Sequence, residues 1–281
     1  MIDPAALVDS IAAKAAPRSR PAEGDYIGEG GLLYCGKCNT PKQCRVNVLD
    51  MERVVSCLCK CATEERDAAE RQREHIKFLD QCNRYRAAGF PEKSMQQWTF
   101  ANDDRSNPKL TQAMEIYVES FRTFKKLGKG LLLYGGVGSG KTYAACCVAN
   151  ALIDKGHPVL VTNFARLSNT LSGMFEGKQQ YIDSLNNFDL LVIDDLAAER
   201  DTEYMQEQVW NIIDARYRAQ LPMIITTNLT GAELKQPKDI TKERIYSRLL
   251  ERCHPIEVQG ADRRRKALKN NFNDMQKMLG L

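Results

Sequence analysis

The stretch Gly135-Gly136-Val137-Gly138-Ser139-Gly140-Lys141-Thr142 decides the fold, because it is a complete G-x-x-x-x-G-K-[ST] phosphate-binding loop. An apolar run, residues 130–134, precedes the loop, and a helix-compatible run, residues 143–149, follows it. These flanks predict a buried strand, a glycine-rich turn and a helix N-terminus, where backbone N–H groups and the helix dipole hold phosphate. A flexible glycine turn that matched by chance would lack such flanks. All eight residues are therefore predicted to contact a nucleotide.

The rest of the nucleotide site is predicted at the ends of two later apolar strands. Lys141 would reach the β- and γ-phosphates, and the Thr142 hydroxyl would ligate Mg²⁺ with Asp194 beside the same ion. Asp195, the next residue, would orient or deprotonate an attacking water. Proteins with this motif mostly carry Glu there, so the shorter Asp changes the reach of the base. Asn228 could hydrogen-bond the γ-phosphate or that water. An ordinary acidic turn is the alternative for the two carboxylates.

From about residue 110 the sequence alternates apolar strands with helices, as a three-layer α/β domain requires. Continuous apolar character is typical of parallel strands that are buried on both faces. The strands are predicted at Leu131–Tyr134, Val159–Thr162, Leu190–Asp194 and Met223–Thr227, and the helices at 141–155, 164–175, 203–219 and 242–252.

Six of the ten cysteines fall between residues 35 and 61, and their spacing predicts a zinc site. Cys35 and Cys38 form one C-x-x-C turn, and Cys57, Cys59 and Cys61 follow about twenty residues later. We expect Cys35, Cys38, Cys59 and Cys61 to bind zinc, with Cys57 as the reserve ligand. The short segment has little core of its own, so metal would supply most of its folding free energy. A redox dithiol is the rival interpretation, but no thioredoxin-like βαβ context surrounds the motif.

Length and composition favour one full domain plus a smaller module in the cytosol. The chain has 281 residues and a formal net charge of +4, which is too mild to imply nucleic-acid binding by itself. No apolar stretch approaches the ~20 residues of a membrane span, and the N-terminus lacks a signal-peptide core. We therefore expect a cytoplasmic protein with no membrane partner. The predicted divisions are an N-terminal helix and linker (1–34), a zinc module (35–61), a charged helical linker (62–98) and the nucleotide domain (99–281).

The order of phosphate loop, acidic strand and Thr-Thr-Asn strand end resembles the AAA+ ATPases over residues 110–270. That resemblance implies a five-stranded parallel sheet in an αβα sandwich, with Asn228 as sensor 1. It also implies an arginine that reaches the neighbouring subunit's site. Arg248 is the first candidate and Arg244, one helical turn earlier, the second, with ordinary surface ion pairs as the alternative. Arg264 is expected to act as sensor 2, or Arg263 if the register is shifted, because Asp262 stands where the family has Ser.

The chain further resembles the DnaC/DnaI group of helicase loaders. The resemblance implies a slow, assembly-stimulated ATPase that self-associates through the AAA+ domain. It also implies binding of a hexameric replicative helicase through the N-terminal module, and delivery of that ring onto single-stranded DNA. The residues that carry the resemblance are Leu33–Lys42, Leu191–Leu196, Thr202–Tyr204 and Ile213–Arg218.

Single-stranded DNA binding needs basic or polar groups along the phosphates and aromatic side chains for stacking. Asn163, Phe164, Arg166 and Lys178 are the candidates, and an ordinary helix start is the alternative. Two other functions compete with helicase loading. An IstB-like transposition helper shares the ATPase core, but the cysteine cluster is not expected there. A zinc-dependent nucleic-acid adaptor without turnover is disfavoured because the full set of predicted catalytic residues is present.

Overall fold

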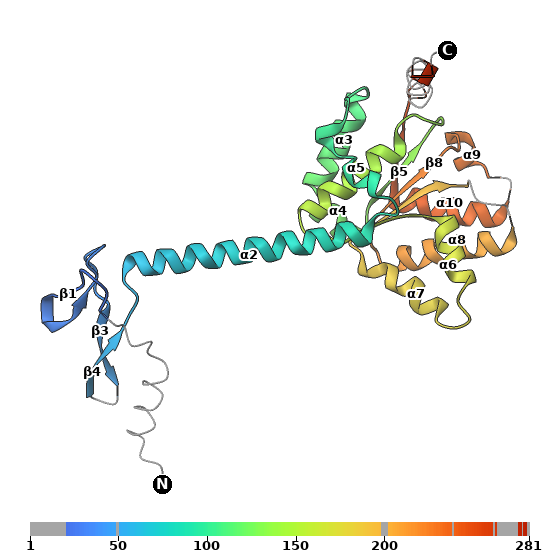
Figure 1. Cartoon of the computed structure of the whole chain (residues 1–281). Coiled ribbons are helices and arrows are strands. Elements are labelled where there is room, and N and C mark those ends of the chain that lie inside the picture. Colours follow the sequence, from blue (N-terminus) through green and yellow to red (C-terminus); the bar gives the residue numbers. More distant parts are fainter. Residues whose placement is uncertain are drawn as a thin grey trace, which may run out of the picture. The chain divides into compact units, whose positions relative to one another are not determined.

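The computed structural model describes residues 21–48, 51–197, 202–237, 239–260, 262, 275–276 and 278–279 of the 281-residue chain. The chain folds as two compact units, Met1–Lys77 and Phe78–Leu281 (Figure 1). Helix α2, Lys60–Gly89, contains the division between them. The first unit therefore ends inside the charged helix rather than at the end of the cysteine cluster.

The described residues of the first unit form four short strands in two antiparallel pairs. Strand β1 (Tyr26–Ile27) pairs with β2 (Leu33–Tyr34) around the 3₁₀ turn Glu29–Gly31, and β3 (Gln43–Val48) pairs with β4 (Met51–Ser56). Residues 26–34, predicted from the sequence as linker, thus contribute strands. Of the described residues up to Lys77, only Leu33, Cys35 and Cys59 are buried. So small an apolar core cannot stabilise a fold by itself, and two of its three members are thiols.

Helix α2 is solvated along most of its length, as its charged sequence predicts. Cys82 and Gly89 are its only buried residues. Cys82 belongs to a core cluster of the second unit, and Tyr85 packs against that cluster. Gly89 approaches β6 so closely that an added Cβ would lie 2.3 Å from the Val159 carbonyl oxygen. The last turns of the helix therefore belong to the second unit, and Pro91 follows where the helix has ended.

The second unit contains a parallel sheet of five strands in the order β6-β7-β8-β5-β9. The strands are β5 (Gly130–Tyr134), β6 (Val159–Asn163), β7 (Leu190–Leu196), β8 (Met223–Thr227) and β9 (Cys253–Glu257). The five-stranded parallel sheet of the AAA+ resemblance is confirmed. The first four strands lie where the sequence predicts them. Strand β9 runs at one edge and contains His254, Pro255 and Glu257, so it lacks the apolar run that marks the others.

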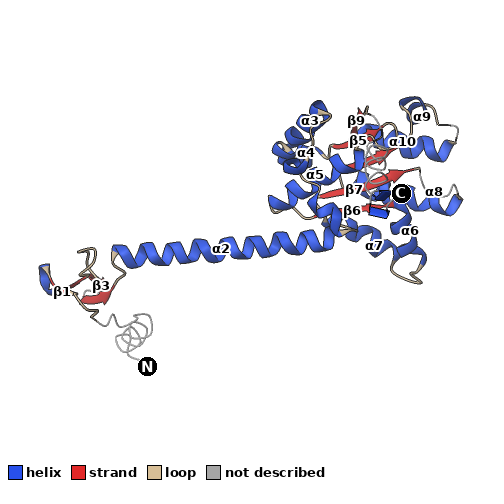
Figure 2. Ribbon diagram, turned by 45° about the horizontal axis from the view of Figure 1, so that its top comes forward, coloured by secondary structure: helices blue, strands red, loops and turns tan. Residues whose placement is uncertain are grey.

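Helices cover both faces of this sheet (Figure 2). One core cluster joins Met114, Phe121 and Leu152 to the sheet, and the other joins Leu167, Ile213 and Leu249 to its opposite face. The three-layer αβα architecture is therefore confirmed. The helices are α3 (Pro108–Glu119), α4 (Phe121–Leu127), α5 (Lys141–Asp154), α6 (Phe164–Ser172), α7 (Lys178–Ser184), α8 (Glu203–Arg218), α9 (Gly231–Lys235) and α10 (Ile240–Arg252), with short 3₁₀ turns at Lys93–Gln97, Phe100–Asn102 and Leu185–Asn187.

One predicted helix differs from the sequence expectation. The helix expected at 164–175 ends at Ser172, and α7 begins at Lys178 after a five-residue loop. Gly177 has φ +80°, a conformation that glycine adopts without strain, and it precedes the new helix as its N-cap. The first helix is therefore three residues shorter than predicted, and α7 is a helix that the sequence pattern did not predict. None of the helices in the described ranges combines the length and apolar character needed to cross a bilayer.

Candidate functional site

The phosphate-binding loop joins β5 to α5, as its motif predicts. Gly138 and Gly140 have φ +74° and +97°, values that a residue with a Cβ adopts only with strain. Lys141 is buried, and its Nζ donates to the carbonyl oxygens of Gly135 at 3.0 Å and Gly136 at 2.8 Å. The same Nζ donates to Asn228 Oδ1 at 2.9 Å. The loop lysine and the strand-end asparagine, 87 residues apart, thus share one site.

The chain that follows β9 runs along the phosphate-binding loop. The Val258 N–H donates to the Tyr134 carbonyl at 2.7 Å, and a Cβ added at Gly135 would lie 2.5 Å from the Val258 carbonyl oxygen. A Cβ added at Gly138 would lie only 1.8 Å from Asp262 Oδ1. The residue that replaces the family's Ser thus brings a carboxylate against the loop. Arg263 and Arg264, the sensor 2 candidates, lie outside the described residues.

Thr226 contacts both acidic residues at the end of β7, one through its carboxylate and the other through its backbone. Its Oγ1 donates to Asp194 Oδ1 at 2.6 Å and accepts from the Asp195 backbone N–H at 3.0 Å. The pairing of β7 with β8 shifts register between Ile193 and Leu196, and Asp195 has φ +55°. A shift of this kind re-aims side chains that would otherwise alternate between the two faces of the sheet. The sequence predicted the two carboxylates but gave Thr226 no role.

Asp194 lies in an environment that suits a bound cation. Burial raises the pKa of its carboxyl above the ordinary value, more than the hydrogen bonds from Thr226 and Thr142 lower it. The neighbouring Asp195 carboxylate adds to this rise in pKa. A divalent cation at this point would offset both effects, and Thr142 and Asp194 are the oxygen ligands that Mg²⁺ prefers. The residues present therefore fit the metal that the motif implies.

A cavity of about 240 Å³ brings seven of the predicted nucleotide residues together, whereas Gly135, Gly136, Ser139 and Asp194 are not among its lining residues. Asp195 and Asn228 both line it, so the proposed base and sensor face the phosphate-binding loop. Two aromatic residues in the lining, Trp98 and Tyr143, were not predicted from the sequence. The full lining is Trp98, Val137, Gly138, Gly140, Lys141, Thr142, Tyr143, Asp195 and Asn228.

Arg248, predicted to act on a neighbouring subunit, lies against α8 of its own chain. Its guanidinium forms an ion pair with Asp214 and stacks 3.9 Å from the centre of the Trp210 ring. It does not belong to the cavity lining described above. Arg244, the second candidate, is exposed on α10.

The residues predicted to contact DNA divide into two groups. Phe164 is 2% exposed and sits in the core, so its predicted stacking role is wrong. The Asn163 side chain caps α6 by accepting from the Arg166 backbone N–H at 2.9 Å. The side chains of Arg166 and Lys178 are exposed. Phe175 is a fully exposed aromatic side chain in the loop between α6 and α7, a segment that the sequence pattern predicted as helix.

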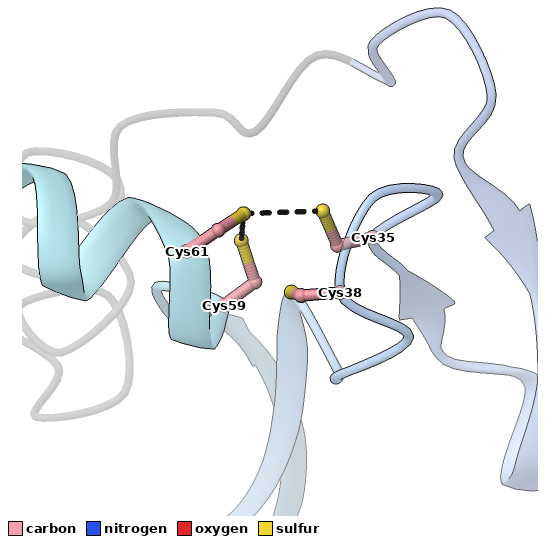
Figure 3. A group of neighbouring side chains, drawn as sticks. All are labelled: Cys35, Cys38, Cys59 and Cys61. Carbon is pink, nitrogen blue, oxygen red and sulfur yellow. Dashed lines mark hydrogen bonds between the residues drawn. The ribbon is translucent and has the colours of Figure 1, made fainter.

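The four thiols chosen as zinc ligands converge in the first unit (Figure 3). All four Sγ atoms lie within 4.8 Å of one another, with Cys35–Cys61 at 3.6 Å and Cys59–Cys61 at 3.4 Å. A tetrahedral zinc with Zn–S bonds of ~2.3 Å requires sulfurs roughly 3.8 Å apart. Cys57 lies outside the group, and its Sγ faces the Pro41 carbonyl oxygen at 3.5 Å. The cluster could therefore hold a metal ion, and four sulfur ligands suit zinc.

The surroundings of the cluster favour thiolates but oppose four of them at once. The Thr40 hydroxyl, followed by the Cys61 backbone N–H, lowers the pKa of Cys38 to about 5. The neighbouring sulfurs, first Cys59 and then Cys35, raise the pKa of Cys61 to about 12. Negative charge on the neighbouring sulfurs disfavours the thiolate form of Cys61 until a bound cation balances that charge. The donor set therefore matches a metal-binding cluster.

The chain is similar to helicase loaders in sequence and in structure. It is 28% identical to the replicative helicase loader DnaI of Bacillus subtilis over 182 residues, which covers 59% of this chain and 58% of that protein. It is 27% identical to the replicative helicase loader DnaC of Escherichia coli over 119 residues, covering 41% and 47% of the two chains. These matches span roughly half the length of each relative. A crystal structure of DnaI superposes with a TM-score of 0.53 and 25% identity, covering 64% of this chain and 99% of that one.

The chain also matches a family model. The model of the IstB-like ATP-binding protein family matches residues 64–271, which is most of the chain and includes every element of the nucleotide site described above. The likeness to DnaI confirms the resemblance that the motifs predicted. The chain belongs to the IstB-like ATP-binding protein family.

Proposed function

We propose that this chain is an ATP-driven loader of the ring-shaped replicative helicase in the cytoplasm. The observation that carries the proposal is the single cavity lined by Lys141, Thr142, Asp195 and Asn228, in a chain similar to two helicase loaders. Binding energy from ATP would switch the protein between states, since a P-loop site of this kind distinguishes the triphosphate from its product.

The cavity residues would divide the hydrolysis step between them. Thr142 and Asp194 would hold Mg²⁺, which supplies positive charge against the phosphates when bound. Lys141 would neutralise the γ-phosphate, and Asn228 would position its oxygens. Asp195 would accept the proton of a water whose oxygen bonds to the γ-phosphorus, while the bond to the β–γ bridging oxygen breaks and ADP departs with that electron pair.

Self-association would complete this site. Arg248 is our candidate for the residue that reaches a neighbouring subunit's γ-phosphate, with Arg244 second. The ion pair with Asp214 and the contact with Trp210 give the Arg248 guanidinium one defined orientation. A planar guanidinium fixed in this manner loses little conformational entropy when it binds phosphate. Hydrolysis would then be slow in the isolated chain and faster in the assembly.

The first unit is our candidate for the helicase-docking part, with zinc held by Cys35, Cys38, Cys59 and Cys61. The second unit would contact single-stranded DNA at the exposed side chains of Arg166, Phe175 and Lys178. Arg166 and Lys178 could bind phosphates, and Phe175 could stack on a base. Phe175 replaces Phe164 in this role because Phe164 is buried.

Co-purification with a replicative helicase from a matched host tests the loader proposal. The full chain, a variant lacking residues 1–77 and the Lys141→Ala variant would be compared with and without ATP. We expect the complex to be lost on truncation and kept by Lys141→Ala. The truncation point follows the division of the chain, so the core of the second unit stays intact. Absence of a complex under every nucleotide condition would contradict the proposal.

The alternative is an IstB-like transposition helper, which the family match favours. The same experiment separates the two functions when the partner is a transposase instead of a helicase. The thiol cluster is the feature that argues for the loader, because the sequence pattern of a transposition helper does not include it.

A further inference from the structure

Two aromatic side chains line the nucleotide cavity, and neither belongs to the phosphate-binding motif. Trp98 and Tyr143 line the cavity, and their ring centres lie 5.8 Å apart at an interplanar angle of 31°. Trp98 comes from the segment between α2 and α3, whereas Tyr143 is in the first turn of α5. Lys141, Thr142, Asp195 and Asn228 supply the polar side chains of the lining, and all four belong to phosphate chemistry. The aromatic pair is therefore left for another part of the ligand.

A buried asparagine fixes Trp98 in this place. Asn150 is 1% exposed, and its Nδ2 donates to the carbonyl oxygens of Met95 and Trp98, both at 3.0 Å. Seven residues earlier on the same helix, the Tyr143 hydroxyl donates to the Thr99 carbonyl at 3.3 Å. Residues 143 and 150 are two helical turns apart and share one face of α5. The helix that begins at the phosphate-binding loop thus also holds the segment that carries Trp98.

Asn150 combines three donated hydrogen bonds with one unpaired oxygen. Its Oδ1 is buried with no hydrogen-bond partner in the described part of the chain. A buried polar atom without a partner costs free energy that an apolar side chain of similar size would not cost. The benefit of Asn150 therefore lies in its donor group, which orders the backbone around Trp98.

We propose that Trp98 and Tyr143 form the nucleobase-binding wall of the cavity, and that Asn150 is the positioning residue that holds Trp98 there. The ligand class is a purine nucleoside triphosphate, recognised at its base by stacking. Aromatic side chains bind bases through their faces, and purines present a larger face than pyrimidines. This inference rests on the proposed nucleotide-binding function and extends it from the phosphates to the base.

Calorimetric titration of the full chain with three magnesium-bound ligands tests the wall. The ligands are ATP, UTP and inorganic triphosphate, which has no base. We expect Trp98→Ala to weaken ATP binding about tenfold, to weaken UTP binding less, and to leave triphosphate binding unchanged. Trp98→Phe, which keeps an aromatic face, should retain most of the ATP affinity. Equal loss of ATP and triphosphate affinity, or loss of neither, would overturn the proposal.

Asn150→Leu tests the positioning role. Leucine has a similar volume, but it removes the hydrogen bonds donated to the Met95, Trp98 and Cys146 carbonyl oxygens together with the unpaired oxygen, so a lower melting temperature is expected and is measured alongside binding. We expect it to reproduce the selective ATP loss of Trp98→Ala. Wild-type affinities for all three ligands would contradict the role of Asn150. If the variant fails to fold, the two Trp98 variants still decide whether the wall exists.

Fluorescence supplies a readout that does not depend on affinity. The chain has two tryptophans, and in a Trp210→Phe background Trp98 is the remaining one. ATP should shift or quench its emission, and inorganic triphosphate should not. Lys141→Ala distinguishes failure of the base-binding proposal from failure of the nucleotide-binding proposal. In a functional nucleotide site, this variant should lose binding of both ATP and triphosphate. A wild-type chain that binds neither ATP nor triphosphate would overturn the proposed function together with the wall.

Discussion

At the scale of single residues, the backbone of Asp195 explains why an aspartate occupies a position where a glutamate is usual. The residue has φ +55°, in the left-handed region where Asp is enriched and longer side chains are rare. Asp195 lines the cavity in this conformation, despite its shorter side chain. The sequence predicted Asp195 as the candidate base, but it could not predict the register shift between Ile193 and Leu196 that surrounds it.

Asp195→Asn tests that residue as the base. The variant keeps the size and the left-handed preference of the side chain but cannot accept a proton. We therefore expect ATP binding within about threefold of wild type and hydrolysis slowed at least ~100-fold. Equilibrium titration and single-turnover hydrolysis measure the two quantities. Undiminished hydrolysis would transfer the role of base to another group.

Asp262 is predicted to weaken nucleotide binding. Its carboxylate lies against Gly138, in the loop that must accept the negatively charged phosphates. Asp262→Asn removes a like charge from that loop, so ATP affinity should rise about threefold or more at low salt and less at high salt. Asp183→Asn, an equal charge change in α7, is the control and should have no effect. Unchanged affinity in Asp262→Asn would contradict this prediction.

At the scale of the elements, ion pairs fix the point where β7 begins. Asp189 accepts from Lys125 at 2.7 Å and pairs with His157 at 2.6 Å, so three separate segments meet at one carboxylate. Burial raises the pKa of Asp189, but the hydrogen bonds from Lys125 and His157 lower it more, so that the net shift is downward from 3.8. A group whose folded pKa is depressed stabilises the fold above its unfolded pKa.

That direction predicts how stability changes with acid. The contribution of Asp189 is fully present above pH 3.8 and is lost as the pH falls through the lower, folded pKa. Asp189→Asn should therefore destabilise the protein at pH 7 and make little difference near pH 2. Urea unfolding of both proteins at the two pH values measures this. An equal loss at both would indicate a packing role instead of a charge role.

The elements were predictable to the extent that their hydrophobic pattern was strong. Strands β5, β6, β7 and β8 are buried on both faces and read as apolar runs, so the sequence located them. Strand β9 lies at the sheet edge and contains a histidine, a proline and a glutamate, so its pattern carries no such signal. Trp98 was missed for a different reason, because it meets Tyr143 only through tertiary packing across 45 positions of the sequence.

At the scale of the whole molecule, the two units are stabilised by different means. The second unit has two large apolar clusters, whereas the described part of the first has three buried residues, two of them thiols. Metal removal should therefore unfold the first unit and leave the second intact. Protein purified without chelator should contain about one zinc equivalent, and Cys59→Ser should lose it while ATP binding persists. A content below about a third of an equivalent would contradict the zinc proposal.

The role of Arg248 has to be tested in the assembled protein, because its contacts with Asp214 and Trp210 within one chain also suit a structural role. It shares Asp214 with Arg218, which lies 2.5 Å from that carboxylate and is 73% exposed. Arg218→Ala is therefore the matched control. If Arg248 acts on a neighbour, Arg248→Ala should lower assembly-stimulated hydrolysis at least ~100-fold, and Arg218→Ala should not.

Mixed assemblies separate the two roles of Arg248. An Arg248→Ala chain keeps its own base, and an Asp195→Asn chain keeps its own arginine. Where the arginine of an Asp195→Asn chain faces the nucleotide site of an Arg248→Ala chain, that site has both the aspartate and the arginine. Mixing the two nearly inactive proteins should therefore restore part of the hydrolysis. A purely structural defect in Arg248→Ala stays within its own chain, and mixing would then restore nothing. Absence of restoration, with Arg244→Ala active in the same assay, would show that neither arginine reaches across the interface.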